Sequence, residues 1–314
     1  DYHIKLRPGT NVAVLNMMLH FIIKSKLYDR DFVRDRTEGF DNFLKEIEKQ
    51  DVDKLAKVAG VNKQLVKEAA IAYATAKNSM EFHGLGVTEH EQGSKTVMLI
   101  ADLAMITGNI GRKGVGVNPL RGQNNVQGAA DMGCQPHQGA GYFEVSDEKN
   151  QKFYTEKYGV THPTKPGLKI PQMFEAAINK ELKGVWIIGE DIVQTDPNSA
   201  HVIEAMNSLE LLVVQEIFMS ETAKLATVVL PGTTFLEKDG TFTNTERRVQ
   251  RVNRAVPPLP GTKPDGVIVT EMMQKLGFDQ PTYDANQVLA EIADIVPFFK
   301  GITRERLGKL GLQW

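Results

Sequence analysis

The chain has 314 residues, more than a usual single domain, so two domains are expected. Its 37 Lys and Arg residues nearly balance its 39 Asp and Glu residues, which argues against a nucleic-acid partner and against a basic membrane-binding patch. No apolar run reaches the ~18 residues that a membrane span needs. The single cysteine, Cys134, excludes an intrachain disulfide and an iron–sulfur cluster held by this chain alone, and it suggests a reducing compartment or an anaerobic cell. A cytoplasmic location is expected.

The first third of the chain is expected to be mainly helical. Thr10 or Asn11 is a good N-cap for a helix over the apolar run 12–23, and Gly9 belongs to the turn before it. Residues 29–77 repeat apolar side chains at helical spacing and are assigned no chemistry.

A short strand is expected at 79–83, followed by Gly84, Gly86 and then Glu89. A lone Gly-x-Gly after a strand is weak evidence for a nucleotide-binding loop. His90 is more often a hydrogen-bonding loop residue than a ligand or base. A helix over 95–106 follows, and Gly108 is expected to be its left-handed cap.

The most unusual segment, 114–133, joins glycines to one arginine, Arg121, and to the amides of Gln123, Asn124, Asn125 and Gln127. Glycines let a backbone approach a ligand closely, while the amides and the guanidinium supply many donors. No regular helix or strand is expected here, because Asn and Gly compete with both. The segment predicts a loop that binds a large, polar, anionic cofactor.

The next stretch carries Cys134 and His137, whose spacing could bind a metal. Two ligands make no zinc site without partners, so a variable loop at the mouth of an active site is favoured. Residues 145–168 are charged and rich in turn formers, and a surface excursion is expected there.

Residues 184–231 alternate apolar strand-like runs (184–188, 211–214 and 227–230) with helical segments. This alternation is typical of a parallel, doubly wound sheet, which binds ligands beyond the carboxyl ends of its strands. The side chains expected on that rim are Glu190, Asp191, Thr195, Gln215 and Thr233.

The remaining segments are expected to support this body. Residues 236–251 are interpreted as a glycine turn between two extended pieces, and 257–261 as a linker. Asp265 is a candidate cap or ligand contact, and helices are expected at 267–276 and 286–295.

Segment 114–133 resembles the signature loop of molybdopterin-dependent formate dehydrogenases, within the dimethyl-sulfoxide-reductase family of bis-pterin enzymes. The resemblance covers almost the whole chain, whereas the chain covers only the middle of the family's catalytic subunit. Further stretches follow in the family's order, at 1–3 with 8–11, and at 84–89, 105–111, 189–196, 215–219 and 236–250.

The resemblance implies an α/β fold with two pseudo-related doubly wound domains and mainly parallel sheets, as in the central domains of bis-pterin molybdenum enzymes. Residues 1–118 would be part of the first pterin-dinucleotide-binding domain, whose N-terminal half is missing. Residues 119–256 would be the second such domain, and 257–314 a linker and helical return segment.

The resemblance also implies two molybdopterin guanine dinucleotides holding molybdenum or tungsten, and oxidation of formate to CO₂ with release of two electrons and a proton. The family's metal-ligating Cys or selenocysteine and its [4Fe-4S] cysteines would precede Asp1. The implied partners are formate, the remainder of the subunit, and an iron–sulfur, flavin/NAD or ferredoxin electron carrier. The 314-residue chain alone is expected to be inactive.

By the same resemblance, Arg121 would position the formate carboxylate, with Gln123 beside it as a second catalytic residue. The sequence departs from the family at 134–142, and at Gly266, where the family usually has Trp. The residues implied to contact the pterin dinucleotides are Gly9, Thr10, Asn11, Gly84, Gly86, Glu89, Gly122, Asn124, Gly189, Glu190, Asp191, Thr195, Gln215 and Asp265.

Two other readings stay open. One is a sister bis-pterin oxidoreductase acting on another small substrate such as nitrate, which the unusual loop at 134–142 allows. The other is a non-catalytic scaffold of the kind found in respiratory complexes. Arg121 with its neighbouring amides argues against a scaffold, which has no need of a buried arginine.

Overall fold

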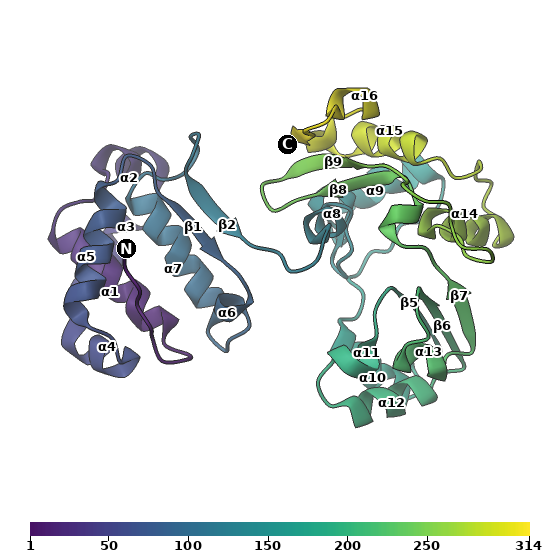
Figure 1. Cartoon of the computed structure of the whole chain (residues 1–314), viewed down its shortest axis with the longest axis horizontal. Coiled ribbons are helices and arrows are strands. Elements are labelled where there is room, and N and C mark those ends of the chain that lie inside the picture. The colour runs from purple at the N-terminus through teal and green to yellow at the C-terminus, as the bar shows by residue number, and fades with distance from the viewer. The chain divides into compact units, whose positions relative to one another are not determined.

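The computed structural model describes residues 1–314 and divides into two compact units, Asp1–Gly122 and Gln123–Trp314 (Figure 1). Each unit is described by itself. The domain boundaries expected after residues 118 and 256 stay a prediction. None of the helices is both long and apolar enough to span a membrane.

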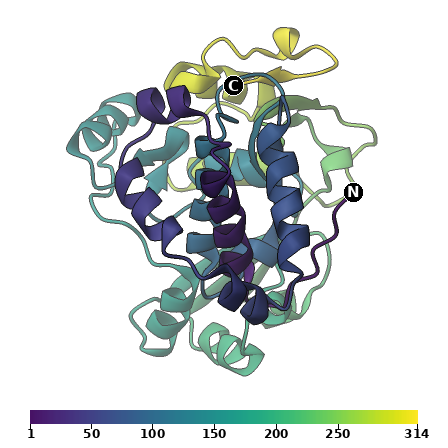
Figure 2. The same ribbon diagram turned by 90° about the vertical axis from the view of Figure 1, so that its left-hand side faces the viewer.

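Unit 1 is built around helix α1 (Asn11–Lys24), which contacts α3 (Phe40–Glu48), α4 (Val52–Ala59), α5 (Lys63–Thr75) and α7 (Gly93–Ile106). In Figure 2 α1 is the dark purple helix in the middle of this group. The apolar run that predicted the helix is also what buries it. The side chains of α1 that lie in the core are Ala13, Val14, Met17, Leu19, Ile22 and Ile23.

Unit 1 also contains a parallel pair of strands, β1 (Met80–His83) and β2 (Gly116–Pro119), with His83 opposite Pro119. The short helices α2 (Arg30–Arg36) and α6 (Leu85–Thr88) complete the unit. The expectation that 114–133 holds no regular element was wrong at this point, because pairing with β1 outweighs the weak strand propensity of Gly and Asn.

Unit 2 contains a parallel sheet of β5 (Gly184–Ile188), β6 (Leu211–Glu216) and β7 (Val228–Pro231), in that order. Its core joins the strands to the flanking helices through Val202, Ala205, Leu212 and Val214. The α/β class with parallel sheets is confirmed. The helices that accompany the sheet are α10 (Ile170–Ile178), α11 (Ile192–Thr195), α12 (Ser199–Asn207) and α13 (Glu221–Leu225).

Unit 2 also holds an antiparallel sheet in the order β10 (Leu312–Gln313), β9 (Arg248–Val252) and β8 (Gly240–Thr243). The turn between β8 and β9 lies at 244–247 and not at the glycine, because Asn244 Oδ1 accepts from Arg248 N and closes it. The helical segments packed nearby or following are α14 (Asp265–Lys275), α15 (Ala285–Ile295), η3 (Pro297–Phe299) and α16 (Arg304–Leu307).

Several helices lie where none was expected, namely α6, α8 (Val126–Asp131), α9 (Glu148–Tyr158), α11 and α16. Helix α8 ends the signature segment, and α9 replaces part of the expected surface excursion. Asp147 caps α9 by accepting from Lys149 N and Asn150 N, and Tyr154 is buried. One buried aromatic residue therefore anchors an otherwise charged helix. The small elements between α8 and α9 are β3 (Gln138–Gly139), η1 (Ala140–Tyr142) and β4 (Phe143–Glu144), and η2 (Phe235–Glu237) follows β7.

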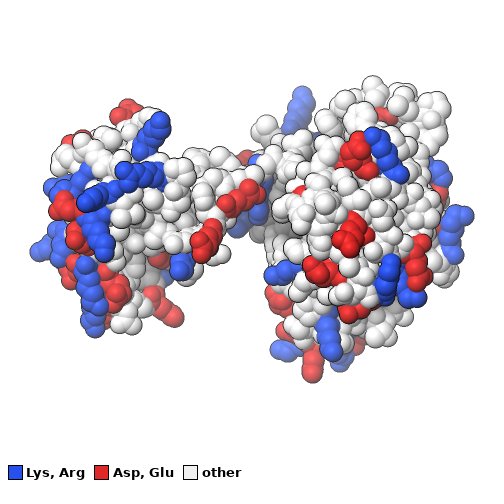
Figure 3. Space-filling view, turned by 90° about the horizontal axis from the view of Figure 1, so that it is seen from below, with Lys and Arg blue, Asp and Glu red and all other residues white.

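Charged side chains of both signs intermingle on the surface of each unit. On the face shown in Figure 3, blue and red side chains alternate without a broad field of one sign. This arrangement matches the near balance of 37 basic and 39 acidic residues.

Candidate functional site

The carboxyl ends of β5, β6 and β7 open onto a cavity of about 370 Å³ in unit 2. Because the three strands are parallel, the residues that follow them meet at this one edge of the sheet. Of the five side chains expected at this edge, Gln215 and Thr233 line the cavity. The residues that line the cavity include Gly189, Gln215, Gly232, Thr233, Lys238 and Asp265.

Gln215 and Asp265 form the polar centre of this cavity. Gln215 Nε2 donates to Asp265 Oδ1 at 2.7 Å, and Lys238 Nζ pairs with Asp265 Oδ2. The Gln215 main chain is also used, since its carbonyl accepts from Gly189 N at 2.8 Å. Gly189, Gln215 and Asp265, three of the residues expected to contact a pterin dinucleotide, therefore lie together, and Lys238 lies beside them.

Two polar atoms beside this centre are buried and have no hydrogen-bond partner, Gln215 Oε1 and Thr233 Oγ1. The residues that carry them are 1% and 4% exposed. A buried polar atom without a partner costs about 1–3 kcal/mol. Two of them lining one cavity indicate a polar ligand that supplies the missing hydrogen bonds.

Asp191 lies at the same rim, but its carboxylate is occupied by donors of the chain itself. Oδ1 accepts from Thr222 N at 3.0 Å and from Thr222 Oγ1 at 2.6 Å. Oδ2 accepts from Gln194 Nε2 at 2.8 Å and from Glu221 N at 3.3 Å. Asp191 therefore ties the loop after β5 to the start of α13, and its role in reading guanine stays a prediction.

Glu190 and Thr195 lie near Asp191 in sequence and are exposed. Thr195 Oγ1 donates to Glu190 Oε1 at 3.4 Å, the long end of the hydrogen-bond range. Their side chains are open to solvent at the rim, and their proposed contacts with a dinucleotide stay predictions.

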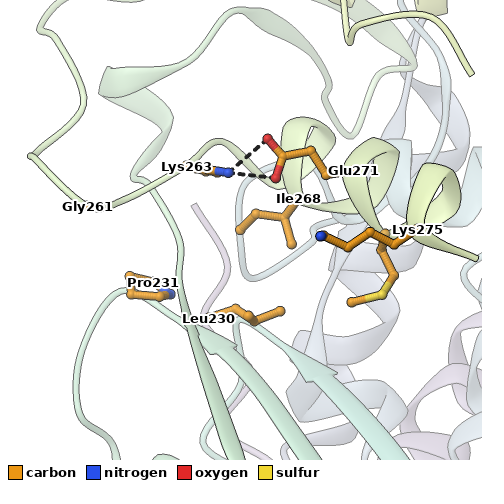
Figure 4. Close-up of a pocket in the computed structure, with 8 residues that line it drawn as sticks. Leu230, Pro231, Gly261, Lys263, Ile268, Glu271 and Lys275 are labelled. Carbon is orange, nitrogen blue, oxygen red and sulfur yellow. Dashed lines mark hydrogen bonds and ion pairs between the residues drawn. The ribbon is translucent and has the colours of Figure 1, made fainter.

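A second cavity, of about 230 Å³, lies between the end of β7 and one face of α14 (Figure 4). Leu230, Ile268 and Met272 give it an apolar lining. Its best-placed polar groups satisfy each other, because Lys263 Nζ pairs with both carboxylate oxygens of Glu271 at 2.8 and 2.6 Å. It has no orphaned buried polar atom, unlike the cavity at the strand ends.

In unit 1 the ends of β1 and β2 bring Gly84 and Arg121 close together. Leu120 N donates to the carbonyl of His83 at 2.6 Å, so the chain positions that follow on each strand are neighbours. A Cβ at Gly84 would lie 3.6 Å from the Leu120 carbonyl. Arg121 is exposed, and its charge helps to lower the pKa of His83.

The other expected contacts of unit 1 lie at helix ends. Gly9, with φ +80°, makes the turn before α1, and Thr10 Oγ1 donates to the Arg7 carbonyl at 2.6 Å instead of capping the helix. Asn11 is the first residue of α1. Gly86 lies in α6, with Glu89 exposed at the end of that helix.

The amides of Gln123, Asn124, Asn125 and Gln127 divide into two pairs. Gln123 and Asn124, like Arg121 and Gly122, are exposed. Asn125 Oδ1 accepts from Thr243 N at 2.9 Å, and Gln127 Nε2 donates to Asp131 Oδ1 at 2.8 Å. The first pair is available to a ligand, whereas the second fixes the segment to the body of unit 2.

Asp131 is the centre of that attachment and is fully buried. Besides Gln127, Tyr142 OH donates to its Oδ1 at 2.7 Å and Trp314 Nε1 to its Oδ2 at 3.2 Å. Arg247 stacks over the Trp314 ring at 5.0 Å. The end of the signature segment is thus held by a network that includes the last residue of the chain.

The comparisons with known proteins can be set against this geometry. A family model described as molybdopterin oxidoreductase matches residues 1–275. The chain belongs to the molybdopterin oxidoreductase family. The resemblance found in the signature segment is confirmed.

Similar proteins in this family include formate dehydrogenases. The chain is 43% identical over 316 residues to the F420-dependent formate dehydrogenase subunit alpha of Methanocaldococcus jannaschii, covering 100% of the chain and 46% of that protein. It is 40% identical over 316 residues to formate dehydrogenase H of Escherichia coli, covering 100% of the chain and 44% of that protein. The chain therefore spans a little under half the length of these relatives.

The fold agrees with the family. Acetylene hydratase from Pelobacter acetylenicus aligns with a TM-score of 0.73 at 19% identity, covering 98% of the chain and 44% of that structure. At this identity the likeness shows the fold alone.

The polar side chains at the strand ends of unit 2 fit a molybdopterin cofactor. A pterin and a nucleotide base carry ring N–H and amino groups, which the orphaned Gln215 Oε1 can accept, while the Thr233 hydroxyl can donate or accept. Lys238 adds a cation suited to a phosphate.

The sequence pattern singled out neither Lys238, which lines the cavity at the strand ends, nor His83, which ends β1. Lys238 lies in the family segment 236–250, which was interpreted only as structural support. His83 directly precedes Gly84 at the end of a strand, which was a usable signal.

Cys134 is a free, exposed thiol. No group of three or more His, Cys, Asp or Glu side chains is placed to hold a metal ion anywhere in the chain. The pair Cys134 and His137 has no third protein ligand beside it.

Proposed function

We propose that this chain is the central part of the catalytic subunit of a molybdenum or tungsten formate dehydrogenase, which oxidises formate to CO₂ with release of two electrons and one proton. The single observation that carries the proposal is the signature segment. Arg121, Gln123 and Asn124 lie at the surface of the chain, and Asn125 and Gln127 hold the segment in place through hydrogen bonds. Identity of 40–43% to formate dehydrogenases over the whole chain supports the choice of substrate.

We further propose that the cofactor is a pair of molybdopterin guanine dinucleotides. When bound, the metal–pterin group supplies the acceptor for the two electrons. Gln215 and Thr233 would hold the base of one dinucleotide through their unpaired buried oxygens, and the neighbouring Lys238–Asp265 pair would complete the lining of the cavity. Glycines at the strand ends, Gly84 and Gly189, would let the backbone approach the dinucleotides.

In this proposal Arg121 positions the substrate. A guanidinium holds a carboxylate through two parallel N–H···O bonds, so it fixes orientation as well as charge. Formate has no other handle than its carboxylate, so this one residue carries most of the orientation. Gln123 and Asn124 would donate amide hydrogens beside it and exclude water from the carboxylate.

The same proposal predicts a [4Fe-4S] cluster in another part of the subunit and a cytoplasmic location. It also predicts an iron–sulfur, flavin/NAD or ferredoxin electron carrier as partner.

The test is analysis of the full-length subunit purified without oxygen. The proposal predicts about two pterins and one molybdenum or tungsten per subunit, together with formate-dependent reduction of a viologen dye. A subunit that contains pterin and reduces nitrate, but does not reduce the dye with formate, would be a sister bis-pterin oxidoreductase and not a formate dehydrogenase. Absence of pterin from a folded subunit would contradict the proposal altogether.

A further inference from the structure

Strand β1 exposes its apolar side chains and buries its polar ones, which is the reverse of the usual pattern. Met80 and Phe82 are 39% and 61% exposed, whereas His83, at the carboxyl end of the strand, is 6% exposed. Glu81, two residues before His83 and therefore on the same face, is half-buried and receives a hydrogen bond from Tyr73 OH. The face turned into the protein thus carries the two titratable groups.

His83 has no partner for its buried ring nitrogen. Its Nδ1 is buried and makes no hydrogen bond. Burial, reinforced by the charge of Arg121, lowers the pKa of His83 below its ordinary value, so the ring is neutral at physiological pH. A neutral imidazole has one nitrogen that donates and one that accepts. An unpaired buried nitrogen is costly unless a ligand completes it.

The position of His83 matches that of the orphaned atoms in unit 2. It ends a parallel strand and precedes Gly84, and its carbonyl accepts from Leu120 N at 2.6 Å, beside the start of the signature segment. Ligands of α/β sheets bind at such strand ends. Arg121 can only donate hydrogen bonds, so His83 is the group here that can accept one.

We propose that His83 is a cofactor-contacting residue of unit 1, whose neutral imidazole accepts a hydrogen bond at Nδ1 from an N–H group of a bound pterin dinucleotide. This inference rests on the proposed cofactor and adds a residue that the family's motif did not supply. Unit 1 then contacts the cofactor through an acceptor, His83, while Arg121 nearby stays with the substrate carboxylate.

The test compares His83→Phe with His83→Asn in the full-length subunit. Phe keeps the ring shape and removes both nitrogens, whereas the Asn side-chain oxygen can take the place of Nδ1. His90→Phe is the matched control, because His90 is an exposed histidine a few residues later. Pterin and metal per subunit are measured after dilution and gel filtration, and thermal unfolding is measured on cofactor-free protein.

His83→Phe is expected to retain the pterin about tenfold less well, since one hydrogen bond is lost. His83→Asn should stay within about twofold of the wild type, and His90→Phe should match it. The cofactor-free His83→Phe protein should unfold at the same temperature as the wild type or higher, because the unpaired buried nitrogen is gone.

Three results would overturn the inference. Wild-type pterin content in His83→Phe would show that no cofactor contact exists. Loss of pterin together with a lower unfolding temperature of the cofactor-free protein would assign His83 a structural role. Full pterin content with a raised KM for formate would make it a substrate contact. A wild-type subunit that itself lacks pterin refutes the proposed function, which is a separate result.

Discussion

Asp191 and Asp265 lie at one rim of the parallel sheet in unit 2, but their carboxylates are used differently. Burial works to raise the pKa of Asp191, but hydrogen bonds from Thr222, Glu221 and Gln194 bring it below its usual value. Asp265 instead meets Gln215 and Lys238 in a cavity that still holds unpaired atoms. Both acids could be identified in the sequence, but the different uses of their carboxylates could not, because the hydrogen-bond partners come from distant segments.

We expect Asp191→Ala to destabilise unit 2 by about 2 kcal/mol, because it leaves the buried Thr222 hydroxyl and main-chain N–H without their acceptor. The neighbouring Glu190→Ala, which removes one weak exposed contact, should change stability by less than about 0.5 kcal/mol. Chemical denaturation of the cofactor-free protein measures both. Equal stability of the two variants would show that the Asp191 bonds contribute little.

Thr233→Val tests the orphaned hydroxyl in the same cavity. The change keeps the shape of the side chain and removes a buried oxygen that has no partner. The cofactor-free protein should therefore be as stable as the wild type or more stable by about 1 kcal/mol, while pterin occupancy falls. Calorimetry of the cofactor-free protein checks the stability, and the pterin content of the purified full-length subunit checks the occupancy. A variant that unfolds at a lower temperature than the wild type and keeps its pterin would show that Thr233 does not contact the cofactor.

At the scale of elements, the alternation of strands and helices over 184–231 could be predicted because each apolar run is short and bounded by turn residues. Helix α9 was missed because its charged sequence hides the one anchor, Tyr154, although Asp147 was a readable cap. Strand β2 was missed because only its pairing with β1 makes a glycine-rich stretch extended. Of the candidate site, the strand-end rim could be predicted, but not which polar atoms stay unpaired.

Strand β1 also makes stability depend on pH. Burial raises the pKa of the Glu81 carboxyl to about 7 from an ordinary value of 4.5. The folded protein therefore holds this proton more tightly than the unfolded chain, so the stabilisation is complete below about pH 4.5 and is lost as the pH rises through 7. We expect the free energy of unfolding of unit 1 to fall by on the order of 2 kcal/mol over this range.

Glu81→Gln removes the titrating group and keeps the side chain's shape and its acceptor for Tyr73 OH. Denaturation curves of the variant should lack this fall between pH 4.5 and 8. A fall of the same size in Glu81→Gln would assign the pH dependence to another group.

The whole chain spans 46% of the formate dehydrogenase alpha subunit of M. jannaschii. Neither of its two units contains a group of side chains that could hold a metal ion. We therefore expect the 314-residue chain alone neither to reduce a dye with formate nor to bind an iron–sulfur cluster. Activity assays and iron analysis of the purified chain check this. Formate-dependent dye reduction by the chain would contradict it.

The most direct measurement is the formate turnover and metal content of Arg121 variants of the full-length subunit, assayed on the same samples. Arg121→Lys keeps the charge but loses the two-pronged hydrogen bond, so turnover should fall by about tenfold or more, and Arg121→Ala should lose more. Both should keep wild-type metal and pterin, because in this proposal other residues, such as Gln215 and Thr233, hold the cofactor. Parallel loss of activity and metal would instead show that Arg121 binds the cofactor, and would contradict the account of substrate positioning.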